Sequence, residues 1–240
     1  MSKKDEHYGL VALLPMKAHS ARVISKNFRD FAGKPLFRWI LDNLLETSGV
    51  DLVVINTDAR EILRENGLED GYGGKVLIRD RKPELCGDFV SMNLVLADDV
   101  AAVSADAYLM THTTNPLLSS ATMGAAIEKY RTAKASGPTD SLFTVNKFQT
   151  RFYRADGSAV NHDPNNLIRT QDLEPWFEEN SNLYLFSRES FAATNARIGK
   201  TPIMHEIPKL ESADIDDAED WMIAEAVARY QGKRPESETQ

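Results

Sequence analysis

Two groups of charged residues in this 240-residue chain have types and spacing that suit a charged ligand. The first follows an apolar run at 8–15 and places Lys17, Arg22 and Lys26 within ten residues. The second is the acidic segment ADIDDAED, in which Asp214 and Asp216 are separated by one residue. Ammonium and guanidinium groups neutralise anions, and carboxylate oxygens are the ligands that hard divalent cations prefer. The sequence therefore predicts an anion-binding loop and offers a candidate metal-binding pair.

The cationic loop belongs to a chain whose formal net charge is −8, which disfavours a general nucleic-acid or anionic-membrane binder. Positive charge gathered in one place favours a small anionic ligand instead. Neither G-x-G-x-x-G nor G-x-x-x-x-G-K-[ST] occurs, so a dinucleotide-binding Rossmann site and a P-loop are both disfavoured. The loop must supply its charge through side chains, with Ser20 and backbone amides as additional donors.

The acidic pair can bind one cation only in an extended backbone. There, residues two apart point to the same side, whereas on a helix Asp214 and Asp216 would be about 200° apart. A metal site therefore requires the last helix to begin at Asp217 or later. Acidic residues also gather at helix N-termini because of the helix dipole, and the residues alone leave that alternative open.

Apolar runs alternate with helical patterns in the first part of the chain, which is typical of a mostly parallel sheet covered by helices. Strands are expected at 8–15, 51–58, 75–80 and 106–112, and helices at 35–49, 59–67 and 119–137. A further helix is expected after Asp88, which would be its N-cap. Its apolar residues recur at helical spacing and are Phe89, Met92, Leu96, Val100 and Val103.

Ligands of open α/β sheets bind beyond the carboxyl ends of the strands, so the residues that follow each apolar run are the informative ones. After the second strand come Thr57 and Asp58, and after the third come Arg79 and Arg81. The fourth strand is followed by 112–115. The residues that follow several of these strands can therefore face an anion.

The pattern changes from about residue 140. Residues 140–160 alternate apolar and polar side chains around Asp156-Gly157, which predicts a hairpin projecting from the main sheet. A strand and a helix are expected at 181–195, and Ile223, Val227 and Tyr230 predict the buried stripe of a last helix. We expect a single domain over 1–240, with 145–185 as an excursion.

Composition and cysteine content indicate an ordinary soluble protein of the cytoplasm. Cys86 is the only cysteine, so no intrachain disulfide can form, and a small buried side chain is its expected role. The chain start lacks the apolar core of a signal peptide, and no run approaches the roughly 20 apolar residues of a membrane span.

Five ordered motifs resemble those of the acylneuraminate cytidylyltransferases, the CMP-sialic acid synthetases, and more distantly the CMP-Kdo synthetases. In chain order they read LPMKAHSARVISKNFRDFAGKPL, RDRKPELCGD, LMTHTTNPL, IRTQDLEPWFEENSNLYLF and ESADIDDAEDWMIAE, and together they cover nearly the whole chain. The first is similar to the family's nucleotide-binding signature, and the last to its magnesium-binding ending.

The resemblance implies an α/β fold of the nucleotide-diphospho-sugar transferase type, Rossmann-like, with a mixed, mostly parallel sheet. The implied reaction couples CTP to an acidic acceptor, a nine-carbon ulosonic acid such as a sialic-type sugar, and releases pyrophosphate. It also implies Mg²⁺ as the cofactor and a homodimer in which 145–185 reaches toward the partner subunit's site.

Site residues follow from the matched motifs. The expected catalytic residues are Lys17, Arg22, Lys26, Asp214 and Asp216, and the last two would bind the metal. The expected nucleotide-binding residues are Lys17, Ser20, Lys26, Asn27, Arg81, Asp88 and His112. The expected acceptor-binding residues are Asn115, Arg169, Gln171 and Asn182.

The chain departs from the family pattern mainly in its first loop. Lys17 stands where the family has arginine, Ala21 and Arg22 where it has glycines, and Ile24 where it has proline. Lysine offers a point charge rather than a bidentate fork, so we hypothesise that Arg22 takes over part of the lost role. His112 replaces a glutamine and can serve either as a hydrogen-bonding group in the site or as a structural residue at the strand end.

Three alternatives remain open. The acceptor can be a Kdo-like acid or a phosphonate. An aspartate pair on an α/β scaffold also suits a metal-dependent glycosyltransferase, which would release a nucleoside diphosphate rather than pyrophosphate. A nucleotide-binding relative that has lost catalysis is the third.

Overall fold

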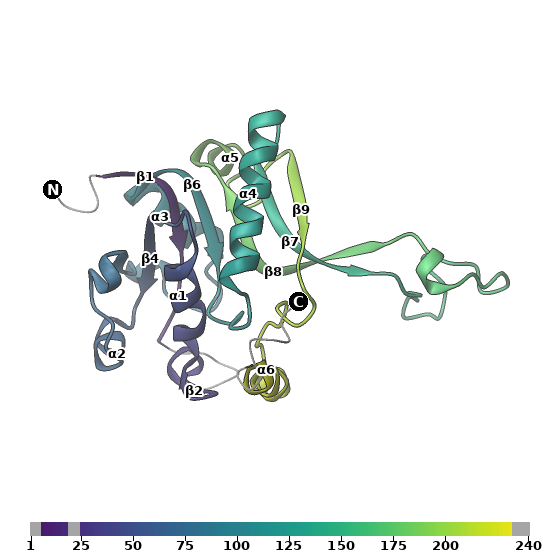
Figure 1. Ribbon diagram of the computed structural model, residues 1–240, viewed down its shortest axis with the longest axis horizontal. Helices are drawn as coiled ribbons and strands as arrows, with labels where there is room; N and C mark the ends of the chain where they lie inside the picture. The colour runs from purple at the N-terminus through teal and green to yellow at the C-terminus, as the bar shows by residue number, and fades with distance from the viewer. Residues whose placement is uncertain (1–5, 19–24, 232–240) are drawn as a thin grey trace.

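The computed structural model describes residues 6–18 and 25–231, and within them most strands belong to one mixed sheet (Figure 1). Its strands are β1 (His7–Leu13), β4 (Leu52–Thr57), β5 (Val76–Asp80), β6 (Ser104–Thr111), β7 (Ser141–Phe148), β8 (Trp176–Phe186) and β9 (Pro202–Glu206). Their order in space is β5-β4-β1-β6-β8-β7-β9. A separate ribbon is formed by β2 (Asp30–Phe31) and β3 (Lys34–Pro35).

The four strands expected from the first half of the sequence form the parallel part of this sheet. β1 pairs in parallel with β4 and β6, and β4 pairs in parallel with β5. β8 is antiparallel to β6 and β7, whereas β9 is parallel to β7. The predicted mixed, mostly parallel Rossmann-like sheet is confirmed, and the carboxyl ends of β1, β4, β5 and β6 meet at one edge.

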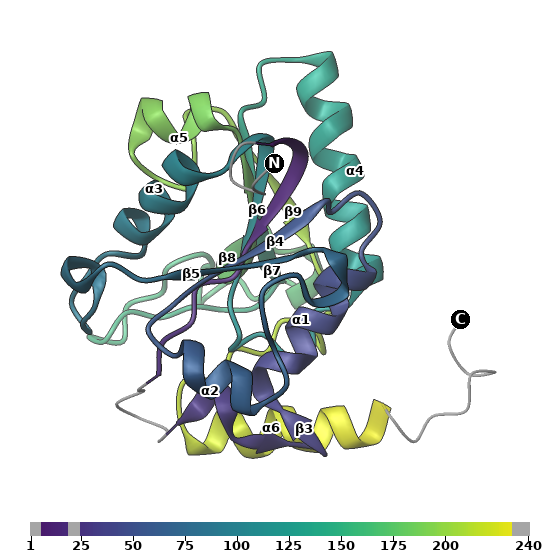
Figure 2. The ribbon, with the colours of Figure 1, turned by 90° about the vertical axis from the view of Figure 1, so that its left-hand side faces the viewer.

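Two helical layers cover the sheet. The helices are α1 (Leu36–Glu46), α2 (Arg60–Glu65), α3 (Met92–Ala102), α4 (Ser120–Ser136), α5 (Arg188–Thr194) and α6 (Ala218–Gln231). Along β1, Leu10 and Ala12 pack with α1 and α4, whereas Val11 and Leu13 pack with α3 and α5 (Figure 2). Because both faces are buried, this strand is a continuous apolar run. No helix in 6–18 and 25–231 has the length and apolar character needed to cross a membrane.

The last helix, α6, closes the fold below the sheet edge through a small aromatic core. The Phe31 ring meets Trp221 edge-on at 5.2 Å and Trp39 at 5.7 Å between centroids. The Trp39 indole N–H donates to the Phe31 carbonyl at 2.8 Å. This cluster also buries Ile215, which lies between the two candidate metal-binding aspartates.

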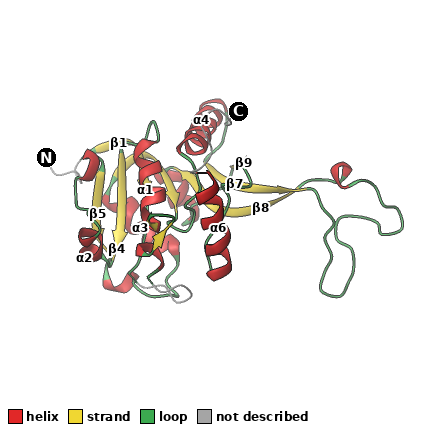
Figure 3. Cartoon of the chain, turned by 60° about the horizontal axis from the view of Figure 1, so that its bottom comes forward, coloured by secondary structure: helices red, strands yellow, loops and turns green. Residues whose placement is uncertain are grey.

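β7 and β8 continue beyond the sheet as a two-stranded arm that carries residues 149–175 away from the body (Figures 1 and 3). The expected projecting hairpin exists, but its strands pair β7 with β8 rather than across Asp156-Gly157. That dipeptide forms only a small turn at the tip, where the Arg154 amide donates to the Ser158 carbonyl at 2.8 Å. The sequence correctly predicted a turn at Asp156-Gly157. The alternating strand before the turn, β7, pairs with β8, which lies much later in the chain.

Three expectations about packing are wrong. Helix α3 begins at Met92, so Asp88 is not its N-cap and Phe89 is fully exposed. Asp88 instead pairs with Lys17. Cys86 is exposed because it lies in the same loop.

On α6, Ile223 and Tyr230 face solvent, while Trp221, Ala224 and Ala228 are buried. The large Trp221 ring and the small alanines fit against Phe31, which decides the face that packs. Strand β9 was not predicted, because its half-exposed sequence at the sheet edge carries little apolar signal.

We predict that Phe31→Ala lowers the free energy of unfolding by about 3–5 kcal/mol, because it leaves a cavity between two tryptophans. Urea denaturation followed by tryptophan fluorescence measures the change. Phe89→Ala is the matched control, since a fully exposed ring contributes little to the core. Equal effects of the two substitutions would contradict the packing described here.

Candidate functional site

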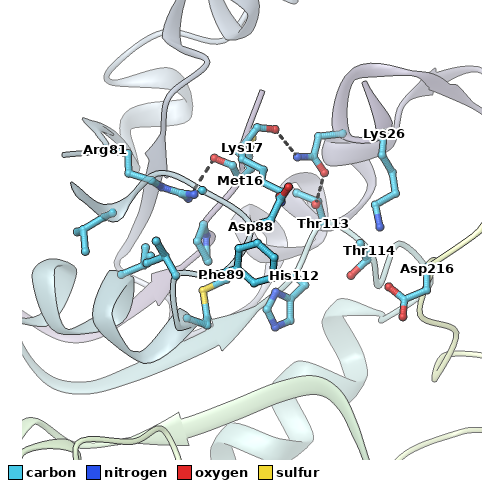
Figure 4. A pocket seen from close by; sticks show the side chains of 17 residues that line it. Met16, Lys17, Lys26, Arg81, Asp88, Phe89, His112, Thr113, Thr114 and Asp216 are labelled. Carbon is cyan, nitrogen blue, oxygen red and sulfur yellow. Dashed lines mark hydrogen bonds and ion pairs between the residues drawn. The ribbon is translucent and has the colours of Figure 1, made fainter. Parts of the chain in front are cut away.

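A cavity of about 580 Å³ opens where the carboxyl ends of the parallel strands meet (Figure 4). It is lined by Pro15, Met16, Lys17, Lys26, Asn27, Arg81, Leu85, Gly87, Asp88, Phe89, Val90, Met92, Val95, His112, Thr113, Thr114 and Asp216. In Figure 4, Arg81 lies on one side of the cavity, and Lys26 and Asp216 lie on the other. The site therefore brings together cations and a carboxylate from segments far apart in the sequence.

The chain beyond β1 is held against the end of β4. The Met16 amide donates to the Asn56 carbonyl at 3.1 Å, and the Ala18 amide donates to the Asp58 carboxylate at 2.7 Å. Lys17 Nζ, between these two anchors, reaches Asp88 Oδ1 at 2.5 Å. The backbone contacts thus fix the position from which the lysine extends.

Asn27 joins this loop to the end of β6. Its Nδ2 donates to the Lys17 carbonyl at 2.8 Å, and its Oδ1 accepts from Thr113 Oγ1 at 2.6 Å. The side chain is only 6% exposed, and both ends of its amide are bonded within the protein. Asn27 therefore holds two walls of the cavity together.

Arg81 is held at the cavity wall by the protein backbone and one amide. Its Nε donates to Asn56 Oδ1 at 3.0 Å, and its Nη2 donates to the carbonyls of Asn56 at 2.8 Å and Met16 at 3.2 Å. Burial lowers the pKa of the guanidinium, an effect that the nearby acidic groups oppose. Arginine is nevertheless charged at any physiological pH, so it supplies a fixed positive charge.

The acidic segment meets the condition for a shared metal. α6 begins at Ala218, and Asp217 caps it by accepting from the amides of Glu219 at 2.8 Å and Asp220 at 3.0 Å. Asp220 in turn accepts from the Asp217 amide at 3.1 Å, which completes a capping box. Asp214 and Asp216 lie before the helix, and the Asp216 amide also donates to the Asp220 carboxylate at 3.0 Å.

These two carboxylates have the right chemistry for a hard cation. Burial raises the pKa of Asp214, and the negative charges of Asp216 and Asp220 add to that, while a hydrogen bond from Thr114 opposes it. A cation between Asp214 and Asp216 would relieve the repulsion.

The part of the chain that the structure describes holds no cluster of three or more His, Cys, Asp or Glu residues placed for a metal. Two carboxylates fit Mg²⁺, which is usually bound by one or two protein ligands together with substrate phosphates and water.

His112 lines the cavity as a neutral imidazole. Burial lowers the pKa of His112 to about 4, and the positive charges of Arg197 and Lys26 add to the effect. At neutral pH the ring can donate one hydrogen bond and accept another, but it adds no charge.

The expected acceptor-binding residues lie elsewhere. Arg169 and Gln171 lie on the exposed arm, where Arg169 pairs with Asp172 at 2.7 Å, and neither lines the cavity. Asn115 and Asn182 are fully buried behind the acidic segment. Their Nδ2 atoms donate to the carbonyls of residues 213 and 212 at 3.3 and 3.4 Å. Ser20 and Arg22 lie outside the described residues.

Several residues of the cavity were not singled out from the sequence. Thr113 and Thr114 fall within the segment 112–115 that follows a predicted strand. That position is the sequence feature that points to them. Phe89 was assigned to a helix by its spacing. Asn56, which bonds to Arg81 but does not line the cavity, also carries no motif, because its sequence position resembles that of any polar residue at a strand end.

Comparison with known proteins identifies the family and the fold type. Residues 11–229 match the family model described as cytidylyltransferase, and the chain belongs to that family. It is similar to pseudaminic acid cytidylyltransferase of Campylobacter jejuni, with 25% identity over 89% of this chain and 94% of that protein. It is equally similar to CMP-N,N'-diacetyllegionaminic acid synthase of Legionella pneumophila, with 25% identity over 90% of this chain and 94% of that protein.

A third relative is N-acylneuraminate cytidylyltransferase B of Danio rerio, with 27% identity over 93% of this chain and 52% of that longer protein. Among solved structures, the fold resembles a CMP:2-keto-3-deoxy-manno-octonic acid synthetase complexed with CTP. The TM-score is 0.64 at 15% identity, over 93% of this chain and 99% of the other. The expected family and fold type are confirmed.

We predict that His112→Gln flattens the pH dependence of stability in mild acid. With a folded-state pKa of about 4 against an ordinary 6.5, the unfolded chain binds the proton first as the pH falls. The stability contribution is therefore complete above pH 6.5 and is lost as the pH falls toward 4. The wild type should lose up to about 3 kcal/mol more than the variant in this window. Urea titrations at several pH values test this, and parallel curves would contradict it.

Proposed function

We propose that this protein transfers CMP from CTP to a hydroxyl group of an acidic nine-carbon ulosonic acid and releases pyrophosphate. The observation that carries the proposal is the cavity itself, which gathers Lys17, Lys26, Arg81 and Asp216 at the sheet edge of a cytidylyltransferase-family chain. The named activities of the pseudaminic and legionaminic relatives support this acceptor class.

In this proposal the triphosphate binds among Lys17, Lys26 and Arg81. Lys17 contacts a carboxylate in the structure, but an ammonium group has three donors and can also bond a phosphate oxygen. Ser20 and Arg22 follow Lys17 closely in the sequence and are proposed to add donors. Preorganised groups of this kind typically stabilise a transition state by about 3 kcal/mol each.

Asp214 and Asp216 are proposed to hold Mg²⁺, which would supply Lewis-acid chemistry when bound. The acceptor oxygen attacks the α-phosphorus in line as the bond to pyrophosphate breaks, and the hydroxyl proton is released. His112, Asp88 and Asn27 are proposed to position the nucleotide. In this arrangement the chain's own cations face the leaving pyrophosphate.

We further propose that the enzyme works as a homodimer in the cytoplasm. The arm exposes several large apolar side chains, which are Tyr153, Leu167, Ile168, Trp176 and Phe177. Apolar groups gathered on a projecting element are typical of a contact surface. Arg169 and Gln171 would then reach the acceptor of the partner subunit, while Asn115 and Asn182 support the acidic segment.

We predict that Asp216→Asn raises the Mg²⁺ concentration needed for half-maximal pyrophosphate release and lowers kcat by about two to three orders of magnitude. The amide has lost the charge that holds the cation. Asp217→Asn is the matched control, because asparagine is also a good N-cap and its position serves the helix. A similar Mg²⁺ requirement in both variants would count against the aspartate pair.

We predict that CTP and Mg²⁺ support pyrophosphate release with nine-carbon ulosonic acids. A coupled phosphate assay should use pseudaminic, legionaminic and sialic acids together with Kdo and a phosphonate, and product mass identifies the CMP-sugar. Turnover only with Kdo or the phosphonate would move the assignment to that alternative. CTP binding without turnover of any acceptor would favour a non-catalytic relative, and release of a nucleoside diphosphate from a nucleotide sugar would favour a glycosyltransferase.

A further inference from the structure

A buried polar network lies behind the cavity, between α3 and the sheet. Asp99 on α3 and Asn56 on β4 are both fully buried. Asp99 Oδ1 accepts a hydrogen bond from Asn56 Nδ2 at 2.8 Å and also pairs with Arg79 on β5. A carboxylate in such a place is costly unless it is well paired, so its presence calls for a physical reason.

The network continues from Asn56 to the cavity. Asn56 Oδ1 accepts from Arg81 Nε at 3.0 Å. An asparagine amide has a donating end and an accepting end, and Asp99 can only accept while it is ionised. With Nδ2 bonded to Asp99, Oδ1 must face Arg81. The reversed amide would set its NH₂ group against the guanidinium and its oxygen against the carboxylate.

This orientation matters because Arg81 is a rigid, planar group at the cavity wall. Its Nε and Nη2 are both held by Asn56, and Nη2 also reaches the Met16 carbonyl. Fixing two of the three nitrogens fixes the plane of the fork. A guanidinium held in this way can meet an anion without first losing rotamer freedom.

We propose that Asp99 is a positioning residue that acts through Asn56 to hold the Arg81 guanidinium in place for the nucleotide. The proposal rests on the proposed CTP-binding function. It assigns a role to two residues that do not line the cavity and that carry no recognisable motif.

The competing explanation is that Asp99 only neutralises Arg79. Arg79 already has a carboxylate partner, because its Nη2 lies 2.8 Å from Asp98 Oδ2. Asp98 is shared with Lys82 at 2.6 Å, whereas the Asn56 amide donates to Asp99. Burial also raises the pKa of Asp99 to about 6 despite Arg79, so ionising it opposes folding. A residue kept only for stability would be better apolar.

A double-mutant cycle on CTP affinity tests the proposal. Isothermal titration calorimetry of the full chain should show Asp99→Leu and Arg81→Ala each weakening CTP binding about tenfold to a hundredfold, as expected when a charged hydrogen bond is lost. The double variant should bind CTP no more weakly than Arg81→Ala alone, because both changes remove one interaction. Asp99→Asn keeps an acceptor for Asn56 and should restore affinity to within about threefold of wild type.

Asp98→Leu is the matched control, since it removes a neighbouring carboxylate and its ion pairs but leaves Asn56 bonded to Asp99. Its effect on CTP affinity should be small and should multiply with that of Arg81→Ala. If Asp99→Leu fails to fold by circular dichroism, Asn56→Ala takes its place in the same cycle.

Multiplying effects of Arg81→Ala with Asp99→Leu, or with Asn56→Ala, would overturn the proposal. Equal losses for the Asp98 and Asp99 variants would do the same. A wild type that binds no CTP would overturn the proposed function itself, and with it this role, whereas CTP binding with a multiplying cycle overturns the role alone.

Discussion

One hydrogen bond joins the two charged segments that lie farthest apart in the chain. Lys26 Nζ donates to the backbone carbonyl of Ile215 at 2.5 Å, across 189 positions of sequence. The Ile215 side chain points into the aromatic core under α6, so its carbonyl is fixed by packing as well as by this bond. Asp214 and Asp216 flank it, before the start of α6. The position of Lys26 relative to Asp214 and Asp216 therefore depends on this contact and on the Phe31–Trp221 cluster that anchors α6.

The way the cations are held explains how a net-acidic protein can present positive charge. Lys26 is bonded to a carbonyl, and Arg81 is bonded to two carbonyls and an amide oxygen. Neutral acceptors orient these groups without cancelling their charge. Lys17 bonds to the carboxylate of Asp88, which is exposed. Because water screens an exposed pair strongly, this contact contributes little to stability.

The features predicted best from the sequence were the buried parallel strands and the residues that follow them. Parallel strands covered on both faces are continuous apolar runs, so β1, β4, β5 and β6 and their exits were found, and with them Lys17, Lys26, Arg81 and His112. Side-chain partnerships between distant segments were not predictable. Asp88 has the residue type and sequence position of a helix N-cap, but it pairs with Lys17. Ile223 is apolar and has the helical spacing of a core residue, but the face of α6 that packs carries Trp221 and two alanines. Asn56 and Asp99 matter only through each other and Arg81, which no spacing rule can reveal.

The arm formed by β7 and β8 also depends on side-chain contacts between segments that are distant in the sequence. Its base is bent where Thr144 bonds to Asn180 and to the Leu183 amide, beside Ser181 with a φ of 57°. Farther out, Phe152 stacks on Trp176 at 5.4 Å and meets Phe148 at 6.2 Å between centroids. These hydrogen bonds and the Phe152–Trp176 contact join the two sides of the arm. Since this tip carries the expected acceptor-binding residues away from the cavity of its own chain, the proposed dimer gives the simplest physical reason for the arm, which is that each copy completes the acceptor side of the other.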